Sequence, residues 1–382
     1  MPLPEPAEEA VSTKHKRLYV TDPKLQNPSG LHHFADQFGI EIVPTRKRVT
    51  LRDVARETGL ALSTVSNALA GKSLVKPATR DYVVEMAEKM GYRASLVARA
   101  LRSQRSYAIG VLIEDVANPS ASAFVRGVED VVNFAGCTIL LANTDGELAR
   151  QVVAMSALID RDVDGLVLIS QHLDDEKVHG MLRGDVPAVL IQRRVSELEL
   201  DYVGSDNVGG IQEALRYVGK LGHRRVGYIT GPLVSSSARE RLGAFRETAS
   251  ELGLIDVESL IYEGRYTFDA GLEAAGFFSG LPERPTCVFA SNDLSAIGLI
   301  QGLCERGINV PSGMSVVGLD DIELAGIKAI DLTTIRLEKR AIGAEAARLL
   351  LRRVDDPDAP VSTKILPTKL IVRGTTGAID CQ

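Results

Sequence analysis

The sequence predicts an α/β fold in which a small helical module precedes a larger core of parallel sheets, and three observations predict it. Apolar residues recur at helical spacing between residues 46 and 106. From residue 107 onward, short and fully apolar runs alternate with helical segments, the pattern of parallel strands covered on both faces. Residues 107–376 exceed one typical domain in length, so we expect two lobes.

Three narrow apolar stripes predict three short helices packed around one small core. Gly59 ends the first helix, and Gly91 ends the third. The stripes are Leu51, Val54, Ala55 and Thr58, then Val65 and Leu69, then Val83, Met86, Ala87 and Met90.

Seven apolar runs predict strands of the core. Ligands of such sheets bind outside the carboxyl ends of the strands, so two facing lobes form a ligand-binding cleft. The predicted strands are Ala108–Ile113, Thr138–Ala142, Gly165–Ile169, Pro187–Ile191, Arg225–Ile229, Cys287–Ala290 and Ser315–Leu319.

The first 45 residues form a proline-rich extension, which we expect to be largely disordered apart from a short helix over Leu31–Phe38. The rest divides into a helix-turn-helix domain (46–94), a hinge helix and linker (95–106), the two-lobed core (107–376) and a tail (377–382).

Charge is unevenly distributed along the chain. Residues 46–106 hold 13 Lys and Arg against 5 Asp and Glu, a net charge of +8, whereas the remaining residues carry −14. A basic module on an acidic body is typical of a protein that binds a polyanion at one end, although a solvated basic linker would show the same charge.

The four cysteines are scattered without a C-x-x-C pair, so we expect reduced thiols and no metal site. Met1–Ala10 lacks the apolar stretch of a secretory signal, and no apolar run is long enough to span a membrane. We therefore expect a cytoplasmic protein.

Residues 49–69 read as a helix, a glycine-containing turn and a second helix, which is a helix-turn-helix. Leu62, Ser63, Ser66 and Asn67 share the face of the second helix opposite Val65. Asn67 suits bidentate pairing with adenine in the major groove. A helical bundle that binds no nucleic acid is the alternative, and the basic surplus argues against it.

From about Arg48 to Thr376 the sequence resembles the LacI/GalR family of transcription regulators. Motifs matching that family occur in order along both predicted domains. They are Asp53–Arg56, Ser63–Ser66, Gly91–Arg93, Leu96–Leu101, Arg161–Gly165, Leu221–Arg225, Ser291–Leu294, Ser315–Gly318 and Leu332–Thr334.

The resemblance implies a homodimeric DNA-binding regulator, a repressor that reads a pseudo-palindromic operator and needs no cofactor. It also implies a hinge helix starting at Ser95, whose Leu101 wedges into the minor groove. The DNA-binding residues that carry over are Leu62, Ser63, Thr64, Ser66, Asn67, Thr79, Tyr92, Ser95, Ala98 and Leu101.

Three positions depart from the family pattern. Ala61 and Lys76 replace residues that cap helices, and Asn67 replaces a usual Arg on the reading face. The operator sequence therefore does not carry over from relatives.

The resemblance further implies a core like that of periplasmic sugar-binding proteins, with a sugar or sugar derivative between the lobes. Arg241 and Asp293 match residues that bind effectors. The alternative for Asp293, which lies at a strand-to-helix junction, is that it caps a helix. The usual aromatic stacking face is missing at Ser120 and Ala121. Gln192 replaces a usual acid, which favours an anionic sugar. The predicted effector contacts are Asn118, Ser120, Gln192, Arg193, Arg241 and Asp293.

Other function classes find less support. The chain has no Walker loop, nucleophile elbow or dinucleotide fingerprint, and Asp320 and Asp321 diverge at a strand end, so we expect no enzyme. A transport-linked binding protein would need a signal peptide. A cytosolic small-molecule-binding protein without specific DNA recognition remains the alternative.

Overall fold

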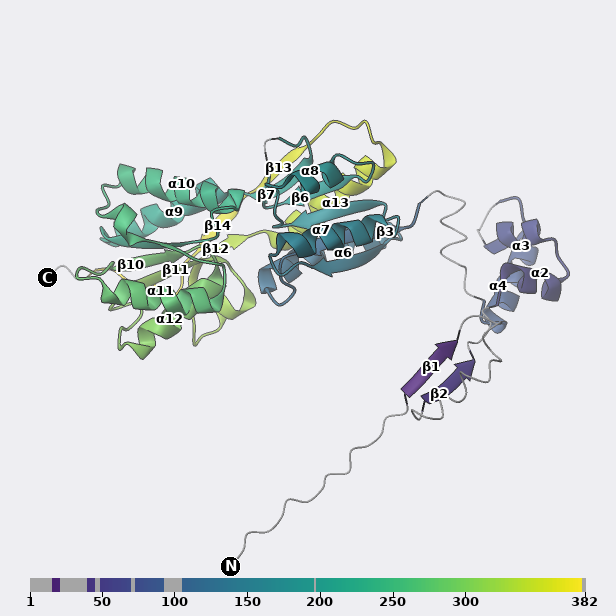
Figure 1. The fold of residues 1–382 in the computed structure, drawn as a ribbon, viewed down its shortest axis with the longest axis horizontal. Coiled ribbons are helices and arrows are strands. Elements are labelled where there is room, and N and C mark those ends of the chain that lie inside the picture. Colours follow the sequence, from purple (N-terminus) through teal and green to yellow (C-terminus); the bar gives the residue numbers. More distant parts are fainter. Residues whose placement is uncertain are drawn as a thin grey trace, which may run out of the picture. The chain divides into compact units, whose positions relative to one another are not determined.

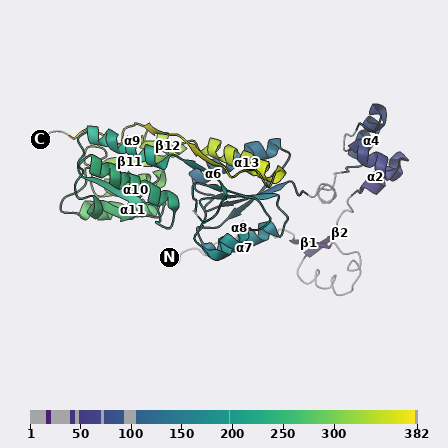
Figure 2. The same cartoon turned by 90° about the horizontal axis from the view of Figure 1, so that it is seen from above.

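The computed structural model divides the chain into two compact units, residues 1–98 and 99–382, which are described separately (Figures 1 and 2). In the first 45 residues, strands β1 (Lys16–Val20) and β2 (Ile40–Pro44) pair in parallel, where we predicted no strand. The helix predicted over Leu31–Phe38 lies outside the described residues. The structure describes residues 16–20, 40–44, 49–69, 73–92, 105–195 and 197–379.

The three predicted helices of the first unit are present as α2 (Leu51–Thr58), α3 (Leu62–Leu69) and α4 (Pro77–Lys89). Thr50 and Asp53 form a reciprocal capping box at the start of α2, because the side chain of each accepts a hydrogen bond from the other's backbone N–H. Gly59 ends α2 with φ of +68°, a conformation that glycine adopts without strain.

A small apolar core joins the three helices. Val54, Val65 and Val83, one from each helix, are completely buried. Leu51, Leu69 and other members of the predicted stripes pack around them. The side chains of α3 that point away from this core are therefore left for the surface.

The second unit contains two six-stranded sheets, one in each lobe. The first lobe orders its strands β13-β7-β6-β5-β3-β4, and the second orders them β14-β12-β11-β10-β8-β9. All pairings are parallel except that of β14 with β12, so the predicted parallel sheets are confirmed with one antiparallel edge strand. The first lobe contains β3 (Ala108–Ile113), β4 (Thr138–Asn143), β5 (Gly165–Ile169), β6 (Ala188–Ile191), β7 (Asp201–Ser205) and β13 (Thr363–Leu366), and the second contains β8 (Val226–Thr230), β9 (Ile261–Glu263), β10 (Cys287–Ala290), β11 (Ser315–Asp320), β12 (Thr333–Leu337) and β14 (Thr368–Ile371).

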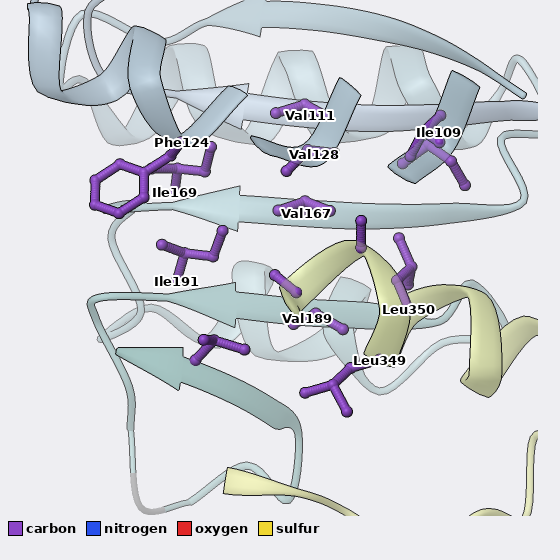
Figure 3. Packing of buried hydrophobic residues seen from close by; sticks show 14 of the residues in the cluster. Ile109, Val111, Phe124, Val128, Val167, Ile169, Val189, Ile191, Leu349 and Leu350 are labelled. Carbon is purple, nitrogen blue, oxygen red and sulfur yellow. The ribbon is translucent and has the colours of Figure 1, made fainter. Parts of the chain in front are cut away.

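Helices cover both faces of each sheet, as Figure 1 shows. In the first lobe, α6 (Pro119–Phe134) and α13 (Lys339–Asp355) pack on one face, and α7 (Leu148–Ile159) and α8 (Glu176–Leu182) pack on the other. Figure 3 shows Val128 and Leu350 of the first pair over Val111, Val167 and Val189 of the strands. The second lobe is covered by α9 (Asn207–Lys220) and α10 (Ser236–Glu251) on one face and by α11 (Phe268–Gly280) and α12 (Asp293–Glu305) on the other.

The chain passes between the lobes three times. It leaves the first lobe between β7 and α9, returns between β12 and α13, and leaves again between β13 and β14. Both lobes are therefore built from segments that are distant in the sequence.

Two glycines allow α6 and α13 to touch backbone to backbone. A Cβ added at Gly127 would lie within 2.9 Å of three backbone atoms of α13, and one added at Gly343 would meet the backbone of α6. Backbone atoms cannot rotate away as side chains do, so a larger residue must separate the helices.

We expect Gly127→Ala to lower the free energy of unfolding by about 1 to 3 kcal/mol, the usual cost of overpacking. Gly243→Ala is the matched control, because Gly243 lies within α10 and its added Cβ would meet nothing within 4 Å. That control should be neutral or stabilising by up to about 1 kcal/mol, since alanine favours helix. Urea unfolding of both variants, followed by circular dichroism, measures the difference; equal stabilities would contradict this close packing.

Candidate ligand-binding cavity and nucleic-acid interface

A cavity of about 720 Å³ lies between the two lobes of the second unit. Its walls come from the carboxyl ends of the strands of both sheets. Glu114 and Gln192 follow β3 and β6 in the first lobe, and Asn292 and Asp320 lie at the ends of β10 and β11 in the second. This is the position at which parallel α/β sheets bind ligands.

Five of the six predicted effector contacts line this cavity: Asn118, Ser120, Gln192, Arg193 and Arg241. Asn118 caps α6, since its side chain accepts a hydrogen bond from the backbone N–H of Ser120 at 2.9 Å. The start of α6 therefore faces the cavity with its side chains fixed by the helix cap.

Gln192 and Arg193 lie side by side after β6, and both are buried. Gln192 donates from Nε2 to Ser205 Oγ at 2.7 Å, while its buried Oε1 accepts no hydrogen bond from the described residues. Arg193 donates to Glu114 at 3.1 Å, so this pair of opposite charges forms part of the cavity wall. The bond to Ser205 and the ion pair with Glu114 hold both side chains in place in the wall.

Arg241 reaches the cavity from α10 and is only 5% exposed. Its Nε donates to Asn207 Oδ1 at 2.8 Å, and its Nη1 donates to the backbone carbonyl of Ser291 at 3.2 Å. These bonds use two of the five N–H donors of a guanidinium, so the group is held in place with donors to spare.

The sixth predicted contact, Asp293, is not among the residues that line the cavity. It is fully buried, and its two carboxylate oxygens accept hydrogen bonds from Thr334 Oγ1 at 2.5 Å and the backbone N–H of Ile322 at 2.9 Å. The alternative, that Asp293 caps a helix, is wrong: Asn292 caps α12 by accepting from Ser295 N.

The sequence analysis missed Asn292 and Asp320 as cavity residues. Both follow predicted strands, so the rule that ligands bind at carboxyl ends of strands was the available signal. Asp320 was considered only together with Asp321, as two carboxylates that diverge at a strand end. Within the described residues, no cluster of His, Cys, Asp and Glu suits a metal ion.

Aromatic side chains reach the cavity from the opposite lobe. Tyr266 and Phe268, between β9 and α11 and at the start of α11, both line it. The Tyr266 hydroxyl is buried without a hydrogen-bond partner among the described residues. Although Ser120 and Ala121 offer no stacking face, the second lobe supplies aromatic surface.

Two acidic groups are buried next to one another beneath and beside the cavity. Burial raises the pKa of Asp293 to about 7, and the nearby Asp320 carboxyl adds to this effect. Burial also raises the pKa of Asp320, although Lys339 opposes it. Because two adjacent carboxylates repel, the pair holds a proton more tightly than isolated carboxyls would.

The helix α3 presents the predicted reading face to the surface of the first unit. Leu62 is 43% exposed and Ser63 is exposed, while Thr64, Ser66 and Asn67 are partly exposed. Val65 and Ala68 are buried on the opposite side. The other predicted DNA contacts divide into Thr79 and Tyr92, which are partly exposed, and Ser95, Ala98 and Leu101, which lie outside the described residues.

Among the described residues, no helix is both long and apolar enough to cross a membrane. A helix-turn-helix module with an outward polar face and a two-lobed core with a cavity at its strand ends define a class: DNA-binding transcription regulators built on a binding-protein core.

The family comparisons agree with this class. Residues 50–95 match the model of bacterial regulatory proteins of the lacI family, and residues 215–376 match the periplasmic binding protein-like domain. Catabolite control protein A of Priestia megaterium is 31% identical over 329 residues, which cover 86% of this chain and 99% of that protein. The chain belongs to the lacI family and is a DNA-binding transcription regulator, which confirms the predicted family and that the chain is not an enzyme.

Two solved structures match most of the chain. The Lac repressor dimer bound to operator and the anti-inducer ONPF has a TM-score of 0.79 and 26% identity, covering 87% of this chain and 100% of that chain. The transcriptional regulator CelR in complex with cellobiose has a TM-score of 0.66 and 29% identity, covering 86% and 100%. The predicted fold class is thereby confirmed.

The raised pKa of Asp293 predicts a pH dependence of stability. An unfolded Asp has a pKa of about 3.9, so between about pH 4 and pH 7 the folded protein binds a proton that the unfolded chain has released. Stability contributed in this way falls as pH rises through that range and levels off above it.

As pH rises from 4 to 7, we expect the free energy of unfolding of the wild type to fall relative to that of Asp293→Asn, because Asn does not titrate. Asp358→Asn serves as the control, since Asp358 is exposed in the turn after α13. Urea unfolding at several pH values measures the difference. If the curves of wild type and Asp293→Asn run parallel, Asp293 does not hold a proton in the folded protein.

Proposed function

We propose that this regulator is a repressor whose affinity for operator DNA is controlled by a small carbohydrate-like effector bound between the lobes. The observation that carries the proposal is the cavity itself, into which both lobes direct polar side chains. A ligand that bridges the lobes favours one arrangement of them over others, which is how binding can alter a distant site. The cellobiose complex of CelR and the anti-inducer complex of the Lac repressor support this assignment.

The chemistry of the cavity supports a polyhydroxylated ring. The guanidinium of Arg241 and the carboxylate of Asp320 each suit paired hydrogen bonds to neighbouring hydroxyls. Phe268 offers an aromatic surface to the apolar face of a sugar. Glu114, Asp115 and Asp145 also line the cavity, so its charge does not single out an anionic sugar.

On DNA, we propose that α3 enters the major groove with Leu62, Ser63 and Asn67 toward the base edges. One three-helix module reads only a few base pairs, so a homodimer on a pseudo-palindrome is the unit of recognition. The Lac repressor dimer on its operator supports this arrangement. Ser95, Ala98 and Leu101 remain proposed hinge contacts to the minor groove.

A thermal-shift screen of sugars, sugar acids, sugar phosphates and nucleobases tests the effector proposal, because a ligand that binds the folded state raises Tm. Each hit is then added to a DNA-binding assay. If no sugar or sugar derivative raises Tm while a nucleobase does, the carbohydrate assignment is wrong.

Arg241→Ala should lower the affinity for the effector by at least about tenfold, the loss expected when a charged hydrogen-bonding group is deleted from a buried site. DNA binding without effector should survive. Arg216→Ala is the control, since Arg216 is a half-exposed arginine of α9 paired with Glu251 on the surface of the same lobe. Calorimetry with the hit from the screen measures both; an undiminished affinity of Arg241→Ala would remove Arg241 from the site.

Binding to a duplex selected from a random pool should weaken steeply as salt rises, because the basic module displaces counterions from phosphates. Asn67→Ala should lower affinity for the selected duplex by about 1 to 3 kcal/mol, while leaving the salt dependence and the affinity for random DNA almost unchanged. Fluorescence anisotropy at several salt concentrations measures these quantities. An affinity that stays flat with salt would argue against phosphate contacts.

A further inference from the structure

A chain of hydrogen bonds connects a contact between the two lobes with the cavity residue Arg241. The chain starts at Arg194, which follows β6 in the first lobe. Its backbone N–H donates to Ser236 Oγ at 3.0 Å, and its Nε and Nη2 donate to Glu240 Oε1 at 3.2 Å and 2.9 Å. Ser236 and Glu240 belong to α10 in the second lobe, so one residue joins the lobes by three hydrogen bonds.

The second step of the chain runs through a buried amide. The other carboxylate oxygen of Glu240 accepts from Asn207 Nδ2 at 2.9 Å, and Asn207 Oδ1 accepts from Arg241 Nε at 2.8 Å. Asn207 is only 4% exposed. A carboxylate accepts and a guanidinium donates, so the two neighbours together dictate which end of the amide faces which partner. The carboxylate of Glu240 thereby sets the orientation of the acceptor that holds Arg241.

The outer end of this chain differs from the inner end in its exposure. The side chains of Arg194 and Glu240 are 50% and 27% exposed, and an isolated ion pair of this kind contributes little to stability. Asn207 and Arg241 are buried, where hydrogen bonds are electrostatically stronger and an unmade bond costs more. We therefore expect a substitution in the outer pair to change mainly the position of the buried groups, and to change the stability of the protein little.

Arg194 is itself held in place within the first lobe. Its guanidinium lies 5.3 Å from the centre of the Tyr202 ring, a cation–π contact, and Tyr202 belongs to β7. A displacement of the first lobe relative to α10 would accordingly carry Arg194 away from Glu240.

We propose that Glu240 and Asn207 are positioning residues for Arg241. Through them, the affinity of the cavity for its effector depends on the contact that Arg194 makes between the two lobes. The inference rests on the proposed function for the role of Arg241, although the hydrogen-bond chain can be tested without any effector. Coupling between two sites is reciprocal. If the contact between Arg194 and Glu240 strengthens binding of the effector to Arg241, then bound effector stabilises that contact by the same coupling free energy.

The test without effector follows the Nε–H group of Arg241 by nuclear magnetic resonance of the full-length chain labelled with 15N-arginine. The signal is identified by its loss in Arg241→Lys. In the wild type this N–H should exchange slowly with water, because it is buried and bonded to Asn207. In Arg194→Gln we expect its exchange to accelerate by about fivefold or more, the lower end of typical coupling between sites.

Arg216→Gln is the matched control, since Arg216 is 47% exposed and pairs with Glu251 at 3.1 Å, a surface pair between α9 and α10 that lacks the link to Asn207. It should leave the exchange of the Arg241 signal unchanged. Arg194→Lys, which keeps the positive charge and a hydrogen-bond donor group, should restore part of the protection. Equal exchange rates in the wild type and Arg194→Gln would overturn the proposal, whatever the cavity binds.

A second measurement uses cellobiose as the probe. If calorimetry shows that it binds the wild type, Arg194→Gln should weaken its affinity by about fivefold, and Arg216→Gln should not; an unchanged affinity in Arg194→Gln would overturn the coupling to the effector. If cellobiose fails to bind the wild type, cellobiose is excluded as the effector. The exchange rates of the Arg241 N–H still decide whether the chain of hydrogen bonds positions Arg241.

Discussion

The burial of both sheets on both faces is the constraint on which the rest of the core depends. Strands such as β5 and β6 are buried along their whole length, so they cannot carry polar side chains except where they end. Several polar side chains of the cavity wall are accordingly concentrated at the carboxyl ends of the strands. Gln192, Asn292 and Asp320 all lie at such ends, and the cavity between the lobes follows from that concentration.

Much of this fold is predictable because buried strands are apolar without interruption. β3, β5 and β10 begin and end where the apolar runs do. The sequence analysis missed β7 and β12, because Asp201 and Arg336 interrupt their apolar character. Those charges depend on partners distant in the sequence: the fully buried Asp201 accepts from Arg352 and Arg353 of α13. No local pattern contains such a pairing.

The candidate site was predictable to the level of strand ends but not of individual side chains. Asn292 and Asp293 are neighbours of similar size and polarity, yet the turn into α12 directs one to the cavity and the other to Thr334 in the interior. Tyr266 and Phe268 follow the three-residue strand β9, which is too short to show as an apolar run. Both outcomes depend on backbone geometry that residue type alone does not specify.

The three passages between the lobes have a consequence for the order in which the protein matures on the ribosome. The first lobe needs α13 against its sheet and β13 beside β7, and both are synthesised after the second lobe's strands β8 to β12. The three helices that carry the reading face, by contrast, are complete early in synthesis and share a core of their own. A nascent chain thus completes its helix-turn-helix module before it completes either lobe of the core.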